Sequence, residues 1–310
     1  MKTVLVLVES VNMYLPILES SGFRLILAPT PAMRAEAVAN GGAEVDAVLT
    51  RGPLGFTAEE MAALPKLGII CVIGAGYERV DLEAAEARGI VVTNGAGVNA
   101  PTVADHAMAL LLAAVRDIPQ ADVSVRRNEW RKVTRPSFAG KRLGILGLGS
   151  VGMAIAKRAQ GFDMVIHYHS RSPRAGVDFN YCATPLALAE ASDFLVVATP
   201  GGGSTRHLID KAAIAALGAD GFLVNIARAS VVDTDALIDA LKQGRLAGAA
   251  LDVFDDEPHV PDALKALNNV VLTPHLAGLS PEASRDTVKM VADNLLAFYA
   301  GQPVLTPVHS

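Results

Sequence analysis

The stretch Arg142-Leu-Gly-Ile-Leu-Gly-Leu-Gly-Ser-Val-Gly152 decides how the rest of the chain is interpreted. Its apolar residues 143–146 predict a buried strand, and residues 153–160 after it predict a helix. The glycines between them have dinucleotide-binding spacing: Gly147 permits a tight turn, Gly149 admits a pyrophosphate to the backbone, and Gly152 allows close helix–strand packing. We therefore expect the phosphates of a dinucleotide at the N-terminus of this helix, where unpaired N–H groups and the helix dipole attract anions.

Composition limits the class of protein. A chain of 310 residues with 51% hydrophobic composition can bury two ordinary cores, so two domains are expected. A net charge of −5 without a basic cluster argues against nucleic acid. The apolar run that ends at Glu9 is too short for a signal peptide or a membrane span, and Cys71 and Cys182 are isolated. We expect a soluble cytoplasmic protein with no membrane, metal or disulfide framework.

Strand-like and helix-like runs alternate through both halves of the chain. Strands are predicted at 3–8, 24–27, 47–49, 68–73 and 90–93, and again at 143–146, 164–168, 194–198, 222–226, 249–253 and 270–272. Helices are predicted between them, for example at 31–40 and 57–64, with a last helix at 281–300. This alternation predicts an α/β protein of two doubly wound (Rossmann-like or flavodoxin-like) domains with a cleft between them. We place the substrate-binding domain at 1–98 plus 286–310 and the dinucleotide-binding domain at 99–285.

Pro101 opens a long apolar segment at 103–115 that has hydrophobic residues on nearly every face. A helix of this kind must be buried on all sides. We therefore expect it between domains or between subunits, and a homodimer interface explains it most simply.

The end of the second strand in the glycine-containing half indicates which dinucleotide is bound. An NAD site carries an acidic residue about twenty residues past the glycines, for the ribose 2′-hydroxyl. Here the sequence has Ser170, Arg171 and Ser172 instead. Serine hydroxyls and a guanidinium can bind a 2′-phosphate, so NADPH (NADP+) is favoured over NADH. The alternative is that Arg171 is a solvated loop residue.

Three polar segments follow predicted strands, at the sheet edge where open α/β sheets bind ligands. They contain Arg228, then Asp252 and Glu257, then His275. Together with the glycine turn and the Thr199-Pro200 pair, they resemble the D-2-hydroxyacid dehydrogenase family over nearly the whole chain. The Ser-Arg-Ser loop is most similar to that of the family's NADPH-preferring glyoxylate/hydroxypyruvate and hydroxyphenylpyruvate reductases.

The resemblance implies a catalytic trio, and the chemistry of the residues agrees with it. Arg228 can hold the carboxylate of a small 2-keto acid in a bidentate fork and polarise the neighbouring carbonyl. His275 can donate a proton to the carbonyl oxygen as hydride arrives. Glu257, hydrogen-bonded to His275, would fix the ring and favour its protonated form. Any one of the three alone has an ordinary structural explanation, as a cap or a surface charge.

The resemblance also implies the remaining site residues. Asp252 corresponds to the residue that orients the nicotinamide ring, and the substrate loops contribute Leu54, Ala75 and Gly76, although ordinary turn chemistry is the alternative for both loops. The expected cofactor-binding residues are Gly147, Gly149, Ser150, Val151, Gly152, Ser170, Arg171, Ser172, Thr199, Pro200, Thr205, Ile226, Ala227, Asp252 and Gly278. The other histidines, such as His106, His169 and His207, are interpreted as structural.

Several positions depart from the family pattern. Ala229 replaces a usual Gly, Thr234 and Asp105 each replace a usual Glu, and the loop beginning at Gly201 is unusually rich in glycine. Other functions also stay open at this point: a hydroxyphenylpyruvate-type reductase, a phosphoglycerate dehydrogenase, or a non-catalytic dinucleotide-sensing protein such as a co-repressor. A formate dehydrogenase fits less well, because its chemistry has no use for a His–Glu pair.

Overall fold

The computed structural model describes residues 1–40 and 44–308, and the chain forms two compact units. The first unit comprises Met1–Asn99 and the segment from Leu279 onward, and the second comprises Ala100–Gly278. The expected boundary at 285/286 differs from the observed one, because Ser280 caps one continuous helix, α12 (Pro281–Tyr299). The chain changes unit before this helix and not within it.

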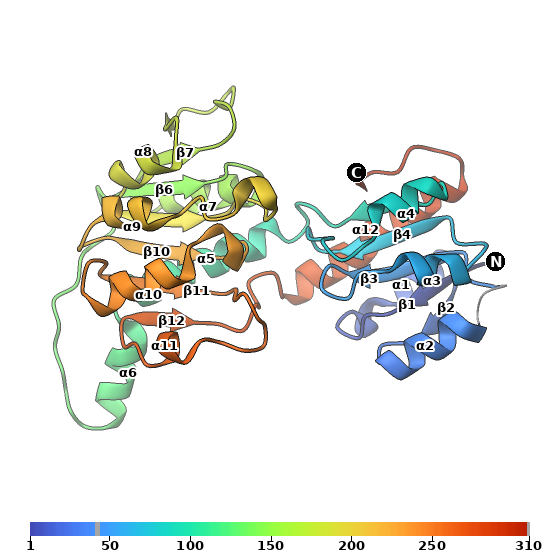
Figure 1. The fold of residues 1–310 in the computed structure, drawn as a ribbon, viewed down its shortest axis with the longest axis horizontal. Coiled ribbons are helices and arrows are strands. Elements are labelled where there is room, and N and C mark those ends of the chain that lie inside the picture. Colours follow the sequence, from blue (N-terminus) through green and yellow to red (C-terminus); the bar gives the residue numbers. More distant parts are fainter. Residues whose placement is uncertain (41–43, 309–310) are drawn as a thin grey trace. The chain divides into compact units, whose positions relative to one another are not determined.

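The first unit is built on a six-stranded sheet with the order β13-β5-β4-β3-β1-β2. Figure 1 labels four of these strands, β4, β3, β1 and β2. Its strands are β1 (Lys2–Val6), β2 (Phe23–Leu27), β3 (Ala47–Arg51), β4 (Ile69–Ile73), β5 (Val91–Asn94) and β13 (Pro307–Val308). The five predicted strands are present and parallel. The sixth, β13, pairs antiparallel with β5 and was not predicted, because two residues carry no periodicity.

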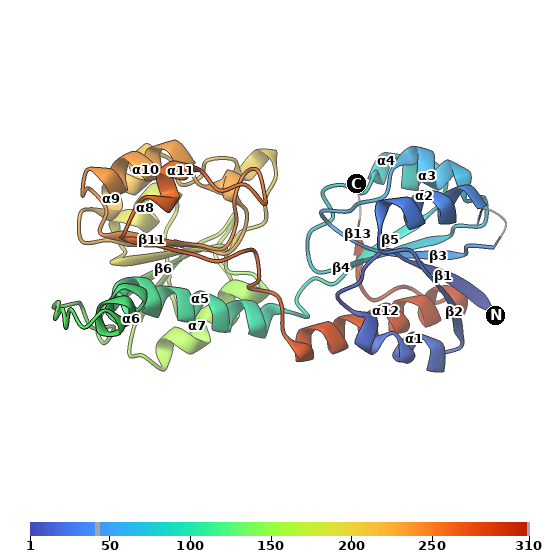
Figure 2. The same ribbon diagram turned by 90° about the horizontal axis from the view of Figure 1, so that it is seen from below.

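Helices cover both faces of this sheet. Figure 2 shows α1 (Pro16–Ser20) and α12 on one face, and α2 (Pro31–Asn40), α3 (Ala58–Ala63) and α4 (Leu82–Ala87) on the other. Buried residues of α12 form one core with β1, β3 and β4. A central strand that is covered on both faces has a continuous apolar sequence, because side chains on both faces are buried. In β1, residues 3–6 are all buried, as this rule requires.

The second unit is built on a seven-stranded parallel sheet with the order β12-β11-β10-β9-β6-β7-β8. Its strands are β6 (Arg142–Leu146), β7 (Val165–His169), β8 (Asn180–Tyr181), β9 (Phe194–Val197), β10 (Phe222–Asn225), β11 (Gly248–Leu251) and β12 (Val270–Leu272). All six predicted strands are present, and the two-residue β8 was missed. The strand order reverses between β6 and β9, so a ligand-binding crevice is expected above the ends of these two strands.

The helices of the second unit form two layers. On one face lie α5 (Ala100–Val115) and α7 (Ser150–Gln160), and α6 (Ile118–Arg126) follows α5 (Figure 2). The other face carries α8 (Pro185–Glu190), α9 (Lys211–Leu217), α10 (Thr234–Lys242) and α11 (Asp262–Lys265).

The apolar helix α5 packs on the sheet of its own unit. Its residues Val103, Ala107 and Leu111 are buried in that core, whereas Asp105 and Ala109 are exposed in the single chain. Packing on the sheet therefore accounts for one apolar face of the helix. Burial of its other face against a second subunit stays a prediction.

In both sheets, an aspartate at the N-terminal end of one strand holds the start of the neighbouring strand. Asp46, just before β3, accepts hydrogen bonds from the Lys2 ammonium at 2.7 Å and the Thr3 N–H at 2.9 Å. Asp193, just before β9, accepts three from Arg142: one from its N–H at 2.8 Å and two from its guanidinium group at 2.8 and 3.3 Å. In each unit the acid therefore clamps the start of the first strand to its neighbour.

The charges at these clamps shift the carboxyl pKa values. Burial raises the pKa of Asp46, but the hydrogen bonds from Lys2 and Thr3 outweigh burial and hold it below its ordinary value. The hydrogen bond from the Arg142 side chain likewise lowers the pKa of Asp193. Both carboxylates are therefore stabilised in the folded protein.

Two further observations concern the whole described chain. Within residues 1–40 and 44–308, no helix is both long and apolar enough to cross a membrane. Cys71 and Cys182 are buried and free.

Candidate active site

The glycine turn after β6 shows why three glycines occur there. Gly147 has a φ of 97°, and a Cβ on it would lie 2.8 Å from the backbone of Thr199. A Cβ on Gly152 would lie 2.0 Å from the carbonyl oxygen of Gly147, so only glycine lets α7 approach the strand this closely. By contrast, a Cβ on Gly149 would meet nothing within 4 Å, which leaves open space above the turn.

This open space lies at the N-terminus of α7, which begins with Ser150, Val151 and Gly152. The first N–H groups of a helix have no partner within it, so they are available to phosphate oxygens. Thr199 and Pro200 follow β9, on the other side of the strand-order reversal. The donors and the open space together fit the pyrophosphate of a dinucleotide.

The Ser-Arg-Ser loop follows β7, the strand next to the glycine turn. The Ser170 hydroxyl donates to the Ser172 carbonyl oxygen at 2.8 Å, and Arg171 is exposed. A second arginine in this loop was not predicted to take part: the guanidinium of Arg174 donates to the carbonyl of Leu148, inside the glycine turn. The sequence feature that could have indicated it is a second basic residue three positions after Arg171.

Arg228 follows β10, and a buried amide holds its backbone. The side chain of Asn225 is 1% exposed, donates to the Arg228 carbonyl at 2.9 Å and accepts from the Ala227 N–H at 3.1 Å. A Cβ on Gly201 would lie 2.7 Å from Cγ of Arg228, so this glycine makes room for the arginine stem. Neither Asn225 nor Gly201 was predicted to act on Arg228, although the unusual glycine loop had been noted.

His275 and Glu257 are in direct contact. Nδ1 of His275 lies 2.8 Å from Oε2 of Glu257, and the other carboxylate oxygen accepts the Phe254 N–H at 3.0 Å. The side chains are 39% and 34% exposed, so the pair is accessible to a ligand. A carboxylate accepts at Nδ1, so Nδ1 carries a proton and Nε2 is left for a substrate.

Asp252 is fully buried, and its carboxylate holds the loop that carries His275. Oδ1 accepts from the Thr273 hydroxyl at 2.5 Å and the Leu276 N–H at 3.0 Å, and Oδ2 accepts from the Ala277 N–H at 2.9 Å. Asp252 was predicted to orient a nicotinamide ring. In the structure its hydrogen bonds orient the segment around His275.

His106, which was interpreted as a structural histidine, has polar contacts that the sequence did not indicate. Its Nε2 lies 3.1 Å from the Thr273 hydroxyl and 3.5 Å from Oδ1 of Asp252. The sequence could not show this contact, because α5 and β12 are far apart along the chain. His169, by contrast, contacts a backbone carbonyl, that of Cys182, at 2.9 Å.

The other predicted cofactor residues lie on loops of the same unit. Ile226 and Ala227 are buried between Asn225 and Arg228, and Gly278 ends the His275 loop. Thr205 closes a short 3-10 turn, in which its hydroxyl donates to the Gly202 carbonyl at 3.1 Å. The structure gives no contact that separates these residues from ordinary loop positions.

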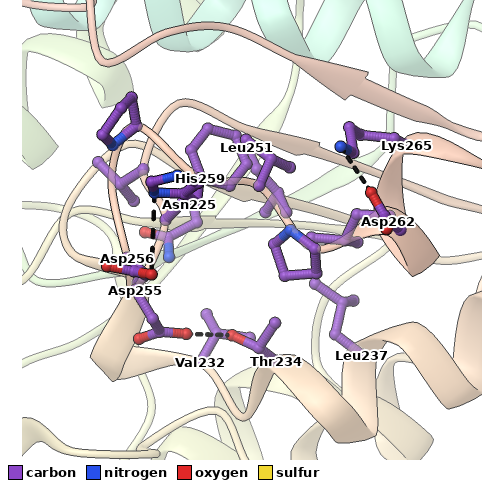
Figure 3. Close-up of a pocket in the computed structure, with 17 residues that line it drawn as sticks. Asn225, Val232, Thr234, Leu237, Leu251, Asp255, Asp256, His259, Asp262 and Lys265 are labelled. Atoms are coloured by element: carbon purple, nitrogen blue, oxygen red, sulfur yellow. Dashed lines mark hydrogen bonds and ion pairs between the residues drawn. The ribbon is translucent and has the colours of Figure 1, made fainter.

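Two of the departures from the family pattern form local pairs. Asp105 forms an ion pair with Arg158 at 2.6 Å, and the Thr234 hydroxyl donates to Asp255 at 2.9 Å. Figure 3 shows the second pair at a pocket of about 600 Å³ between α10 and the loop that carries Glu257. A glutamate at 234 would bring a second carboxylate against Asp255. The lining of this pocket does not include Arg228, Glu257 or His275.

In the first unit, the two predicted substrate loops follow β3 and β4 and pack on each other. A Cβ on Gly52 would lie 2.6 Å from the carbonyl oxygen of Gly76. Asn94 donates to the Ala75 carbonyl at 2.9 Å, which fixes the second loop. In the part of the chain that the structure describes, the N–H groups of Ala75 and Gly76 make no hydrogen bond. Leu54 is half-buried and packs against the cores on both sides of the sheet.

Comparison with known proteins agrees with this geometry. The family model described as "D-isomer specific 2-hydroxyacid dehydrogenase, NAD binding domain" matches residues 108–277. The chain is 44% identical over 268 residues to hydroxyphenylpyruvate reductase of Plectranthus scutellarioides, with 85% of each chain covered. It is 42% identical over 267 residues to glyoxylate/hydroxypyruvate reductase A of Arabidopsis thaliana, again with 85% of each chain covered.

A solved structure is similar over the whole chain. The NADPH-dependent glyoxylate/hydroxypyruvate reductase of Sinorhizobium meliloti, in complex with NADP and malonate, superposes with a TM-score of 0.88 at 38% identity, covering 99% of this chain and 96% of that one. The family model spans more than half of the chain, and its match lies entirely within the second unit. The resemblance read from the sequence is thus confirmed, and the chain belongs to the D-isomer-specific 2-hydroxyacid dehydrogenase family of oxidoreductases.

Proposed function

We propose that the protein reduces a small 2-keto acid of the glyoxylate or hydroxypyruvate type to the D-2-hydroxy acid, with NADPH as the reductant. The observation that carries this proposal is the 2.8 Å contact of His275 with Glu257. This pair and Arg228 follow three neighbouring strands, β10, β11 and β12, at one edge of the sheet. The names of the relatives support the substrate class and the cofactor.

NADPH, when bound, supplies the hydride. The N–H groups at the start of α7 and the open space at Gly149 would hold its pyrophosphate. Arg171 would pair with the 2′-phosphate, and Ser170 and Ser172 lie beside it. Arg174, at the glycine turn, adds a second cation to this side of the site.

Arg228 orients the substrate in this proposal. Its guanidinium binds the substrate carboxylate and draws electron density from the adjacent carbonyl. Asn225 and Gly201 keep the arginine in place. In the first unit, the N–H groups of Ala75 and Gly76 bind carboxylate oxygen as an anion-binding backbone nest, and Leu54 contributes an apolar wall.

His275 moves the proton. Glu257 accepts the Nδ1 hydrogen, so the proton on Nε2 passes to the carbonyl oxygen as negative charge develops there. In the reverse direction Nε2 removes the proton of the hydroxyl group. Reduction therefore uses the protonated ring, and oxidation of the hydroxy acid uses the neutral ring.

A panel of 2-keto acids tests the function. Glyoxylate, hydroxypyruvate, 4-hydroxyphenylpyruvate and 3-phosphohydroxypyruvate are offered with NADPH or NADH, and the configuration of the product is determined. We expect the highest kcat/KM with NADPH and one of the first two acids. Preference for 4-hydroxyphenylpyruvate would instead support the activity of the Plectranthus relative. Turnover of the phosphorylated acid alone, or of none, would contradict the proposal.

A further inference from the structure

We propose that His106 is a positioning residue for His275. It donates the hydrogen bond that fixes the Thr273 hydroxyl, and through it the Asp252 carboxylate that holds the loop at 273–277. The inference rests on the proposed role of His275 as proton donor. It assigns a task to a side chain of α5 that touches neither Glu257 nor His275 in the contacts described above.

The direction of the hydrogen bonds follows from counting protons. Thr273 has one hydroxyl proton, and the 2.5 Å contact directs it to Oδ1 of Asp252. The Thr273 oxygen can then only accept from His106, 3.1 Å away, so Nε2 of His106 carries a hydrogen. The order of donation is His106 to Thr273 to Asp252.

Burial makes this order important. The Asp252 side chain is 1% exposed and that of His106 is 18% exposed. A buried carboxylate needs donors to replace water, and here they are the Thr273 hydroxyl and the N–H groups of Leu276 and Ala277. Without His106, the Thr273 oxygen loses its donor, and its hydroxyl is free to rotate away from Asp252.

The loop transmits this effect to His275. The Thr273 N–H donates to the Leu251 carbonyl, and the His275 N–H donates to the Thr273 carbonyl, both at 3.0 Å. His275 has a φ of 51°, in the left-handed region that non-glycine residues rarely adopt. Its ring is therefore placed by anchors on both sides, Thr273 before it and the amides of 276 and 277 after it.

The first experiment compares His106→Ala with His106→Gln, because the glutamine side-chain amide can donate an N–H in place of Nε2. We expect His106→Ala to lower kcat about 3- to 10-fold, the effect of one lost hydrogen bond, and to change the KM for the keto acid much less. His106→Gln should recover most of the loss. His167→Ala is the matched control, because His167 is another half-buried histidine of this unit, near Arg142 and Asp193.

The second experiment needs no activity. Amide hydrogen exchange at Leu276 and Ala277 should quicken about 3- to 10-fold in His106→Ala and remain near the wild-type rate in His106→Gln and His167→Ala. The double variant His106→Ala/Thr273→Val should lose no more kcat than the worse single variant, since both remove the same hydrogen bond.

The outcomes separate this inference from the proposed function. Unchanged exchange at 276 and 277 and unchanged kcat in His106→Ala, while His275→Ala is inactive, would overturn the positioning role alone. Equal losses in the Ala and Gln variants would also overturn it. Full activity of His275→Ala would instead overturn the proposed proton donor, whatever the exchange rates show.

Discussion

Side chains tie the loops at the carboxyl ends of the strands in both units, but in the second unit a fully buried carboxylate also accepts loop N–H groups. In the first unit, Thr50 donates to the Gly55 carbonyl at 2.9 Å and Asn94 donates to the Ala75 carbonyl at the same distance. In the second, Asp252 accepts two loop N–H groups and Asn225 accepts that of Ala227. Two sheets with the same clamp at their N-terminal ends thus differ in how their C-terminal loops are held. Asp252 accepts loop N–H groups, whereas those of Ala75 and Gly76 make no hydrogen bond in the part of the chain that the structure describes.

This difference suggests a division of labour. A loop held by its carbonyls leaves N–H groups available, as at Ala75 and Gly76, and such groups recognise an anion without a charged side chain. A loop held by its N–H groups has a fixed backbone from which side chains such as Arg228 and His275 can act. Under the proposed function, the first unit recognises the carboxylate of the substrate, and the second unit supplies the side chains that take part in the reduction.

The largest expected effect comes from removing the acid of the second unit. His275→Ala should lower kcat about 10²- to 10⁴-fold, the usual contribution of a positioned acid, and leave the Kd of NADPH nearly unchanged. Steady-state kinetics and fluorescence titration measure the two. Glu257→Gln sharpens the test, since it removes the charge and keeps the shape: kcat should fall while the Kd of NADPH stays near the wild-type value. An unchanged kcat would show that Glu257 does not assist the acid.

Arg228→Lys should have the next largest effect. The charge is retained and the planar fork is lost, which costs about 1.5–3 kcal/mol, or about 10- to 100-fold in kcat/KM for the keto acid. Both KM and kcat should suffer, because orientation as well as binding is lost. Direct titration with NADPH should give the wild-type Kd. A collapse of cofactor affinity would make Arg228 a structural residue and not a substrate ligand.

Arg171→Ala tests the cofactor side of the second unit. We expect NADPH to bind about tenfold more weakly and NADH to bind with little change. A loss of about tenfold is the low end for a charge-assisted contact, because Arg171 is exposed to solvent. Arg126→Ala, at an exposed arginine on α6, is the matched control. Equal weakening of both cofactors would mean that Arg171 does not read the 2′-phosphate. Arg174→Ala then shows whether the second arginine does.

Gly52→Ala tests the first unit alone. The added Cβ would lie 2.6 Å from the Gly76 oxygen, so the amides of the loop must move. Overpacking at the low end of its usual cost, about 1 kcal/mol, should raise the KM for the keto acid about fivefold and leave NADPH affinity unchanged. Gly161→Ala, where the added Cβ would be 3.2 Å from a carbonyl oxygen, is the control. A normal KM in Gly52→Ala would remove the proposed nest.

The smallest effect concerns the clamp that the units share. Asp46→Asn and Asp193→Asn should each cost about 1 kcal/mol of unfolding free energy at pH 7, less than a full charged hydrogen bond because the Lys2 and Arg142 side chains are 51% and 44% exposed. Both carboxyl pKa values are lowered from 3.8, so this stability is present above pH 3.8 and disappears as pH falls through the lowered values.

Urea unfolding at neutral and acid pH measures the clamps. Each variant should lose less stability on acidification than the wild type does. A variant that loses as much as the wild type would show that its carboxylate does not contribute the acid-sensitive part.

Much of the fold could be predicted because its signals are local. The buried strands are continuous apolar runs, and the glycine turn has a fixed spacing in the sequence. The strands β8 and β13 are too short for a periodicity and exist only because a neighbouring strand pairs with them. Composition predicted that α5 is buried, but it could not indicate which face of the helix packs on the sheet of its own unit.

The site could be predicted to a similar depth. Arg228, Glu257 and His275 follow strands, so the topology of a parallel sheet brings them to one edge. Asn225, which holds the backbone of Arg228, and His106, which contacts Thr273, were not singled out, because an asparagine inside a strand and a histidine inside a helix have no local signature of their partners. Their roles arise from contacts across the sheet.

The helix α12 affects the order in which the protein folds during synthesis. Val288, Val291 and Leu295 belong to the same core as Val4 and Leu49, so the first unit is incomplete until this helix has left the ribosome. The second unit is one uninterrupted segment and is complete before then. At about 5–20 residues per second, the nascent first unit waits about 10 to 40 s for its last helix, and until then only α1, among the helices that the structure describes, covers that face of its sheet. The first unit is therefore the first to be synthesised and the last to finish folding. A chaperone that binds the incomplete unit would bind the N-terminal part of the nascent chain.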